Sequence, residues 1–449
     1  MRVAVIGAGY VGLVTGVGLA AAGHDVVCAE LDEARALAVN RGRSPLREPG
    51  LEELLREQLR LGRFRVAQDA KDALSGSRVS ILAVGTPTRA GAIDLSAVLG
   101  AAAQVGAELP DLPAPHVVAV KSTVVPGTTL GPVREVLQRS SGLRLGEFGL
   151  AANPEFLREG SALADFQAPD RIVVGAADLE AELALRELYA PFAAPLLVTT
   201  PAEAELAKYA GNALLATLVS FSNEIARLCE SLPGLDVEAV LGAVHLDRRL
   251  SPREGDRRLS PGILDYLRAG CGFGGSCLPK DLDALRGLAR ERGLATPLLD
   301  AAARVNRERP GEVVRLLEQE LGSLAGREIA LLGVAFKPGT DDTRDSPALG
   351  LAAELASRGA RVRSFDPAAP GGPGACRSLP EALRGADAAL LATAWPEFRN
   401  ADWELLAGLM RTPLLVDGRG ALRGAPLPAR LRTRAVGTSD PRAAGALPA

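Results

Sequence analysis

The stretch VAVIGAGYVGLVTGVGLAAAGHDVVCAELD, residues 3–32, decides the fold. It begins with a short β-branched apolar run, passes through a glycine-rich turn and a segment of helical pattern, and ends in a second strand-like run. This order predicts a βαβ unit. Two later runs, VSILAVGTPT at 79–88 and HVVAVKSTVVPGTT at 116–129, repeat the pattern. The chain is therefore predicted to be an α/β protein, with a doubly wound parallel sheet that helices cover on both faces.

The turn GAGYVG, residues 7–12, has the GxGxxG spacing and opens the predicted helix. Such glycines allow a tight turn and let a pyrophosphate approach the helix N-terminus, where main-chain N–H groups attract anions. Glu30 ends the second strand, where a carboxylate binds the adenosine ribose and repels a 2′-phosphate, so it favours NAD over NADP. Arg35 could indicate NADP, but Glu30 outweighs it. The predicted NAD contacts here are Gly7, Gly9, Tyr10, Val11, Gly12, Glu30 and Arg35.

The domain organisation follows from a change of pattern along the 449 residues. From about residue 201 the strand runs give way to a helical pattern of about 30 residues, long enough to bridge domains or carry a subunit interface. After about residue 309 the first pattern returns, as in REIALLGVAF. We therefore expect two Rossmann-like domains joined by a helical middle domain, with these bounds: 1–200, 201–308, 309–423 and a loose tail at 424–449.

Composition excludes several classes of protein. The net charge of −3 carries no basic excess, which argues against a nucleic-acid binder. There is no apolar run of about 18 residues, so no membrane span is expected. The N-terminus does not resemble a signal peptide. The five cysteines form no CxxC pair, which indicates neither a disulfide framework nor a metal site and favours the reducing cytoplasm.

The stretch GCGFGGSCLPKD, residues 270–281, places a cysteine directly after bare backbone. Cys277 has two interpretations. It is either a small apolar residue in a tight turn, or a nucleophile presented where the missing Cβ atoms let a substrate come close. Lys280 and Asp281 follow it, and a positive neighbour favours a thiolate. These residues alone leave the two interpretations open.

Two pairs of polar residues have helical spacing. Lys208 and Asn212 are four apart on a mostly apolar helix, so they share one face, which is either solvated or aimed at a cleft. Glu155 and Glu159 are also four apart and follow a turn after a predicted strand. Strand ends are where open α/β sheets bind ligands, although a carboxylate there can also simply complement a helix dipole.

These motifs, together with EPGLEELL, NPEFLREG, ELAKYAGNALLA and GVAFKPGTDDTRDSPAL, resemble the UDP-glucose/GDP-mannose dehydrogenase family over residues 1 to about 422. The resemblance implies an N-terminal Rossmann domain for NAD, a long central helix that forms a homodimer, and a C-terminal Rossmann-like domain for the UDP part of the substrate. It also implies a four-electron oxidation of UDP-glucose at C6 in two NAD-dependent steps, through a thiohemiacetal and a thioester on the cysteine.

The same resemblance assigns roles to individual residues. The implied catalytic residues are the nucleophile Cys277, the oxyanion-stabilising Lys208 and Asn212, the acid/base Glu155, and the water-ordering Thr123 and Asp281. Further implied NAD contacts are Thr86, Thr123, Glu159, Lys280 and Arg344. The implied substrate contacts are Glu155, Phe156, Leu157, Lys208, Asn212, Arg258, Tyr266, Leu267, Gly274, Phe336, Lys337 and Arg419. No metal is implied.

The sequence departs from the family pattern at three places. In the family, one motif carries an arginine that reaches the partner subunit's site. Here that motif is duplicated as DRRLSPREGDRRLSPG, so the candidates are Arg249 and Arg258. We favour Arg258 because it is nearer Cys277 in the sequence. Arg47 stands where an aromatic residue is common. Leu278 also occurs in GDP-mannose dehydrogenases, so GDP-mannose is the alternative substrate. A non-catalytic nucleotide-sugar-binding regulator is a further alternative, which the complete set of catalytic residues disfavours.

Overall fold

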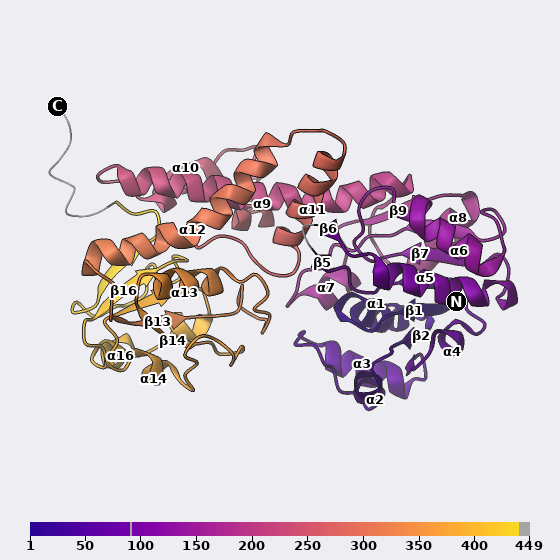
Figure 1. The fold of residues 1–449 in the computed structure, drawn as a ribbon, viewed down its shortest axis with the longest axis horizontal. Helices are drawn as coiled ribbons and strands as arrows, with labels where there is room; N and C mark the ends of the chain where they lie inside the picture. The colour runs from indigo at the N-terminus through magenta and orange to yellow at the C-terminus, as the bar shows by residue number, and fades with distance from the viewer. Residues whose placement is uncertain (90–91, 440–449) are drawn as a thin grey trace. The chain divides into compact units, whose positions relative to one another are not determined.

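The computed structural model describes residues 1–89 and 92–439. Its contacts divide the chain into two compact units, Met1–Gly211 and one that begins at Asn212. We call them the N-terminal unit and the C-terminal unit, and each is described by itself (Figure 1).

The N-terminal unit is built on an eight-stranded sheet of order β10-β9-β8-β7-β4-β1-β2-β3. Every neighbouring pair is parallel except β8 and β9. The strand order reverses beside β1, so the chain crosses to the other half of the sheet after β3. The strands are β1 Arg2–Ile6, β2 Asp25–Ala29, β3 Phe64–Ala67, β4 Val79–Leu82, β7 Val117–Val120, β8 Gly149–Ala152, β9 Ile172–Ala176 and β10 Leu196–Thr199, with a separate small pair β5 Thr88–Arg89 and β6 Ala92–Ile93.

Helices cover both faces of this sheet, and β1 shows why. Val3 and Val5 belong to one apolar core, whereas Ala4 and Ile6, which point the other way, belong to a second. Helices α1, α2, α3, α7 and α8 contribute to the first core, and α4, α5 and α6 to the second. The helices are α1 Tyr10–Ala21, α2 Glu33–Asn40, α3 Leu51–Arg60, α4 Ala70–Leu74, α5 Ser96–Glu108, η1 Leu109–Asp111, η2 Thr129–Val133, α6 Arg134–Ser141, α7 Ala162–Gln167 and α8 Leu179–Tyr189.

The predicted long helix is α9, Pro201–Ser231, which runs without a break from the N-terminal unit into the C-terminal unit. It is followed by α10 Val237–His245, the hairpin β11 Arg253–Glu254 and β12 Arg257–Arg258, η3 Gly262–Tyr266, α11 Leu278–Glu291 and α12 Pro297–Leu321. The expected border at residue 200 falls between β10 and α9. The expected border at 308/309 does not fall in a linker, because α12 passes through it as one helix.

The C-terminal unit also contains a five-stranded, wholly parallel sheet of order β14-β13-β15-β16-β17. On β13, Ile329 and Leu331 enter one core, and Ala330 and Leu332 enter another, so this sheet too is covered on both faces. Its elements are β13 Glu328–Leu332, α13 Pro347–Ser357, β14 Arg361–Phe365, α14 Leu379–Leu383, β15 Ala388–Leu391, α15 Pro396–Arg399, α16 Trp403–Ala407, β16 Leu414–Asp417 and β17 Arg432–Ala435. The predicted fold class is confirmed.

The expected loose tail needs a correction. Residues 432–435 form the edge strand β17, paired with β16 from Leu414↔Arg432 to Asp417↔Ala435. The buried Arg434 side chain fixes this strand by bonding Glu320 and Gln319 of α12. The remainder of the expected tail, 440–449, lies outside the described residues. Within the described part of the chain, no helix is both long and apolar enough to cross a membrane.

Candidate active site

The predicted dinucleotide turn connects β1 to α1. Gly7 has φ +101°, a left-handed conformation that favours glycine. A Cβ on Gly12 would lie 1.9 Å from the Gly7 carbonyl oxygen, so the turn closes only with glycine there. Gly9 caps the N-terminus of α1 and has open space where a Cβ would stand. The main-chain N–H groups at this helix start are thus accessible to a pyrophosphate, as NAD binding requires.

Glu30 follows β2 directly and is held beside the turn. Its carboxylate accepts hydrogen bonds from the main-chain N–H groups of Ala8, at 3.3 Å, and Asp32, at 3.0 Å. The guanidinium of Arg35 lies 3.3 Å from the same carboxylate, with the arginine side chain 41% exposed. Arg35 therefore partners Glu30 rather than standing apart as a 2′-phosphate ligand. Glu30 thus lies where a carboxylate accepts the ribose hydroxyls in NAD-binding folds, and this arrangement fits the predicted cofactor.

Tyr10, predicted as a cofactor contact, is tied to a residue that the sequence analysis missed. Its hydroxyl donates to the Glu48 carboxylate, and burial together with this carboxylate raises the pKa of Tyr10 well above its usual value. Glu48 also accepts the N–H groups of Gly160, at 2.8 Å, and Leu163, at 3.3 Å. This buried carboxylate joins the start of α1 to the loop after Glu159. Glu48 belongs to EPGLEELL, one of the stretches that resemble the family, but no local pattern in that stretch predicts that its side chain is buried.

A buried ion pair joins two of the predicted catalytic residues. The Lys208 ammonium, on α9, lies 3.0 Å from the Glu155 carboxylate, and the side chains are 5% and 7% exposed. Burial alone would raise the pKa of Glu155, but the charge of Lys208, a hydrogen bond from the Leu157 N–H and the charge of Lys121 hold it below its ordinary value. Glu155 is thus ionised at neutral pH. Lys121, another residue that the sequence analysis missed, is itself buried and bonds Asn153 and Tyr189.

Thr123 lies close to this pair. Its carbonyl oxygen accepts a 2.8 Å hydrogen bond from the Thr86 hydroxyl, which brings two predicted cofactor contacts together. A pocket of about 10 Å³, the size of roughly one water molecule, is lined by Thr123, Lys208 and Glu205, among others. Glu205 accepts the N–H groups of Gly127 and Thr129 and has a pKa raised by burial. Glu205 lies three residues before Lys208 on the same helix. This spacing places both side chains on one helix face and could have predicted Glu205 as a site residue.

In the C-terminal unit, Cys277 caps the N-terminus of α11 and is exposed. The positive end of a helix stabilises negative charge on a group at that position, so the placement suits a thiolate. Cys271, in contrast, is fully buried, and its Sγ donates to the Gly418 carbonyl oxygen at 3.3 Å. Burial raises the pKa of the Cys271 thiol, so that cysteine is a packing residue.

Asn212 and Asp281 meet within the C-terminal unit. The Asn212 amide donates to the Asp281 carboxylate at 2.6 Å, and the Lys280 ammonium binds the other oxygen of that carboxylate at 2.6 Å. Asp281 is 1% exposed. Because Asp281 lies in the first turn of α11, four residues after Cys277, this contact places α9 beside the helix that Cys277 caps.

The glycines before Cys277 have a different role from the expected one. The space that a Cβ would need is filled by the protein: at Gly272 by the Asn306 amide, at Gly274 by the Asp345 carbonyl oxygen, and at Gly275 by the Phe336 ring. Gly272 and Gly275 also have φ of +102° and +82°. The bare backbone therefore allows tight packing under the loop, rather than the approach of a substrate at these positions.

The other predicted residues divide between the units. Phe156 stacks under Arg171, whose guanidinium lies 3.9 Å from the ring centroid. Arg419 donates to the carbonyl oxygens of Ala392 and Gly272. Arg344 pairs with Asp342 and is 65% exposed. The remaining predicted site residues also fall in both units. The N-terminal unit contains Val11, Leu157 and Glu159, and the C-terminal unit contains Tyr266, Leu267 and Lys337.

The duplicated element resolves into two different structures. Asp247–Pro252, the first DRRLSP, forms a turn after α10, whereas Asp256–Pro261, the second, contributes strand β12. The Arg249 side chain is 89% exposed and pairs with Asp247. The Arg258 guanidinium instead donates to two carbonyl oxygens of its own unit, those of Leu246, at 2.6 Å, and Ser251, at 3.3 Å.

The N-terminal unit has the parallel sheet, the glycine turn and a carboxylate directly after the second strand, which together are typical of an NAD-dependent dehydrogenase, and this is the class that its site defines. Three family models match the chain in order: the NAD binding domain of the UDP-glucose/GDP-mannose dehydrogenase family over residues 1–193, its central domain over 202–308 and its UDP binding domain over 330–424.

Individual relatives agree. The chain is 42% identical over 439 residues to a UDP-glucose 6-dehydrogenase of Pseudomonas aeruginosa, covering 93% of each, and 40% identical over 438 residues to one of Rhizobium meliloti, covering 94% of this chain and 96% of the relative. A solved UDP-glucose dehydrogenase of the archaeon Pyrobaculum islandicum is 40% identical, with a TM-score of 0.85 over 96% of this chain and 97% of that one. The chain belongs to the UDP-glucose/GDP-mannose dehydrogenase family, and it is an NAD-dependent nucleotide-sugar dehydrogenase.

Proposed function

We propose that the enzyme oxidises UDP-glucose to UDP-glucuronate in two NAD-dependent steps, with Cys277 as the nucleophile. The observation that carries this proposal is the placement of Cys277, which is exposed at the N-terminus of α11 while Cys271 in the same loop is buried. The UDP-glucose dehydrogenases among the relatives support the choice of sugar.

The first step removes a hydride from C6 and a proton from the C6 hydroxyl, which yields an aldehyde. NAD supplies the hydride acceptor in both oxidations. The Lys208 ammonium can stabilise the negative charge that develops on the sugar oxygen, and a donor of this kind contributes about 3–4 kcal/mol in other enzymes. Glu155, ionised beside Lys208, keeps that cation in place and can accept a proton.

The second step requires a covalent intermediate. The Cys277 thiolate adds to the aldehyde carbon and forms a C–S bond, while the carbonyl oxygen takes up a proton. The resulting thiohemiacetal keeps the remaining C6–H bond, from which the second hydride leaves. The product is a thioester. Water attacks its carbonyl carbon, the C–S bond breaks, and the sugar leaves as a carboxylate while Cys277 is restored. We assign the Asn212 amide to the oxyanions, and Thr123 and Asp281 to the ordering and deprotonation of that water.

The decisive experiment measures stoichiometry and sugar preference together. Purified enzyme is assayed with UDP-glucose, GDP-mannose and UDP-N-acetylmannosamine side by side, the last because a solved UDP-D-ManNAc dehydrogenase of Pyrococcus horikoshii is 30% identical with a TM-score of 0.85. We expect two NADH per UDP-glucose, with no free aldehyde trapped by a hydrazine. One NADH per sugar would refute the thioester route, and faster turnover of either other sugar would refute the assignment of UDP-glucose.

We also propose a homodimer through α9. Leu214, Phe221 and Leu228 of α9 follow each other at intervals of seven residues and are 46% to 56% exposed. This spacing places them along one stripe of the helix. Exposed apolar stripes of this kind mark subunit contacts.

For the arginine offered to a partner's site, Arg258 stays a prediction, and we propose Arg249 as the alternative. The Arg258 guanidinium is engaged with carbonyl oxygens of its own chain, whereas Arg249 projects from the turn directly after α10. Because Cys277 acts as a thiolate and must stay reduced, we propose the cytoplasm as the compartment.

A further inference from the structure

The loop that leads to Cys277 is held by side chains rather than by a strand ladder. Asn223 of α9 accepts the Gly270 N–H at 2.8 Å, and Arg309 of α12 donates from Nε to the Gly270 carbonyl oxygen at 2.9 Å. Asn306, one turn earlier on α12, binds both the N–H and the carbonyl oxygen of Phe273 at 2.8 and 3.0 Å. The main chain thus reaches its conformation through residues far away in sequence.

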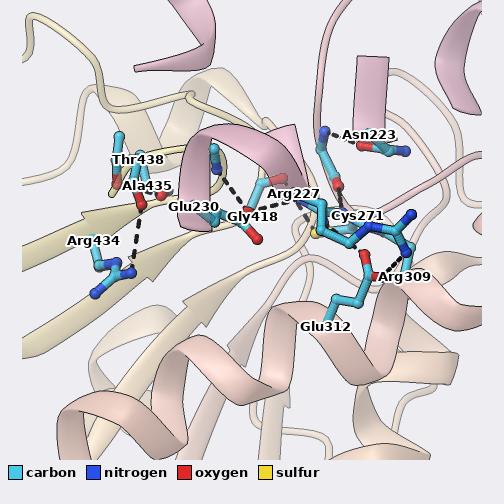
Figure 2. A network of polar contacts seen from close by, with 12 residues as sticks. Asn223, Arg227, Glu230, Cys271, Arg309, Glu312, Gly418, Arg434, Ala435 and Thr438 are labelled. Atoms are coloured by element: carbon cyan, nitrogen blue, oxygen red, sulfur yellow. Dashed lines mark hydrogen bonds and ion pairs between the residues drawn. The ribbon is translucent and has the colours of Figure 1, made fainter. Parts of the chain in front are cut away.

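Arg309 is the most demanding of these partners, because it is completely buried. Its Nη1 lies 2.9 Å from the Glu312 carboxylate and its Nη2 lies 3.1 Å from that of Glu230, while Nε makes the bond to Gly270. Figure 2 shows the guanidinium with its carboxylate partners and Cys271 close by. Glu312 also binds Arg227, and Glu230 also accepts the Gly437 N–H at 2.8 Å.

The two carboxylates neutralise the buried cation, but they do not explain its third contact. A buried ion pair adds little stability over an apolar replacement, so stability alone is a weak reason for this cluster. The guanidinium is a planar fork, which can satisfy two carboxylates and still direct Nε at a carbonyl oxygen, whereas an ammonium is a point charge. The contact that distinguishes Arg309 is therefore its hydrogen bond to the Gly270 carbonyl oxygen. Gly270 lies in the loop, seven residues before Cys277.

We propose that Arg309 is a positioning residue for Cys277: it fixes the Gly270 carbonyl and thereby the loop that sets the sulfur at the start of α11. This role rests on the proposed function of Cys277 as nucleophile. Arg309 does not touch the reacting atoms, and it acts through the main chain from Gly270 to Gly275. It should influence the chemical step more than NAD binding, because the glycine turn predicted to bind NAD belongs to the other unit, and only Lys280 and Arg344 are predicted NAD contacts in this one.

The test compares Arg309→Met and Arg309→Lys with the wild-type enzyme by two measurements. Hydrogen–deuterium exchange follows the amides of residues 270–275, and steady-state kinetics give kcat and the KM for NAD. We expect exchange in 270–275 to quicken, and kcat to fall by about tenfold or more, because small misplacement of a reacting group has effects of that size on the rate. The KM for NAD should change much less than kcat. If the Met variant does not fold, the Lys variant carries the test, since it keeps a cation between Glu230 and Glu312.

Arg227→Met is the matched control, because it removes the other arginine of the same cluster without touching the loop. It should leave both exchange and kcat near wild-type values. Unchanged exchange in both Arg309 variants would overturn the proposal, as would faster exchange with normal kcat, or an equal loss in Arg227→Met. If wild-type enzyme oxidised none of the nucleotide sugars, the proposed function would fail, while the exchange data would still decide whether Arg309 holds the loop.

Discussion

The ammonium nitrogen of Lys208 lies 3.0 Å from a carboxylate oxygen of Glu155, and both side chains are almost completely buried. Four residues further along the same helix, Asn212 donates to the buried Asp281. One helix, α9, therefore carries two polar contacts to predicted catalytic carboxylates, one in each unit. The charges are held before any substrate arrives, which reduces the reorganisation that the reaction demands.

Removal of the cation tests this arrangement. Lys208→Met preserves length and apolar packing but leaves a buried carboxylate without its partner. We expect kcat to fall by about 10²–10³, the usual cost of one oxyanion donor. The free energy of unfolding should fall by about 3–5 kcal/mol, as when one partner of a buried pair is removed. Lys71→Met removes a surface ion pair with Glu108 and should change neither quantity measurably.

The same pair predicts a pH dependence of stability. The pKa of Glu155 is lowered on folding from its ordinary value of 4.5. Its contribution to stability is therefore fully present above that value, and it is lost as the pH falls through the lower folded pKa. Denaturant unfolding of wild type and Glu155→Gln from about pH 7 to about pH 3 should show a stability difference that shrinks on acidification. A difference that stays constant would contradict an ionised Glu155 in the folded protein.

Cys277→Ala should abolish the four-electron reaction while leaving the fold intact. We expect NADH production to fall by about 10³ or more, as for other covalent nucleophiles. The free energy of unfolding should change by less than about 0.5 kcal/mol, because the side chain is exposed. Cys376→Ala changes the one other cysteine that is not buried and should retain full activity. Normal turnover in Cys277→Ala would exclude the thioester mechanism.

Gly274→Ala tests the packing role of the glycines. The new Cβ would lie 2.2 Å from the Asp345 carbonyl oxygen, so the loop must shift. We expect a loss of about 1–3 kcal/mol in the free energy of unfolding, as for other overpacked sites, together with slower turnover. Gly262→Ala is the matched control, because nothing lies within 4 Å of its Cβ position. Equal stability of the two variants would argue against tight packing at Gly274.

The exposed stripe on α9 predicts the oligomeric state. Phe221→Asp combined with Leu228→Asp should convert a dimer into a monomer, because two charges would be buried in the interface. Analytical ultracentrifugation measures this directly. Leu405→Asp, at another leucine that is 61% exposed, is the control and should remain dimeric. A wild-type chain that sediments as a monomer would overturn the proposed interface.

Local patterns predicted the parts of the structure that local forces determine. The alternation of apolar runs predicted the sheets, the GxGxxG turn predicted the start of α1, and the long apolar periodicity predicted α9. Glu30 was identified because strand ends in such sheets have a fixed relation to the turn. Each of these features depends on residues within about one βαβ unit, for which sequence spacing is sufficient.

The features that escaped prediction depend on distant partners. β17 has the sequence RTRA, which carries little apolar signal, and it forms because Arg434 is buried against α12. Arg309 lies in the charged run NRERPGE, which gives no sign that one of its arginines is fully buried. The glycines of 270–275 pack against Asn306, Phe336 and Asp345, some 30 to 70 residues away in sequence. Contacts over such separations are set by the tertiary fold.

The two copies of DRRLSP share every residue, yet one forms a turn and the other enters a strand. Deleting residues 247–255 or residues 253–261 produces the same polypeptide, with a single copy left. That shortened chain keeps only one of the two equivalent arginines, Arg249 and Arg258, at the third position of the motif. One residue there can bind main-chain carbonyl oxygens, as Arg258 does, or project outward, as Arg249 does, but not both. The two copies therefore place the same arginine in two different contacts, Arg258 on main-chain carbonyl oxygens and Arg249 on Asp247 at the surface, and a chain with a single copy has the residues for only one of them.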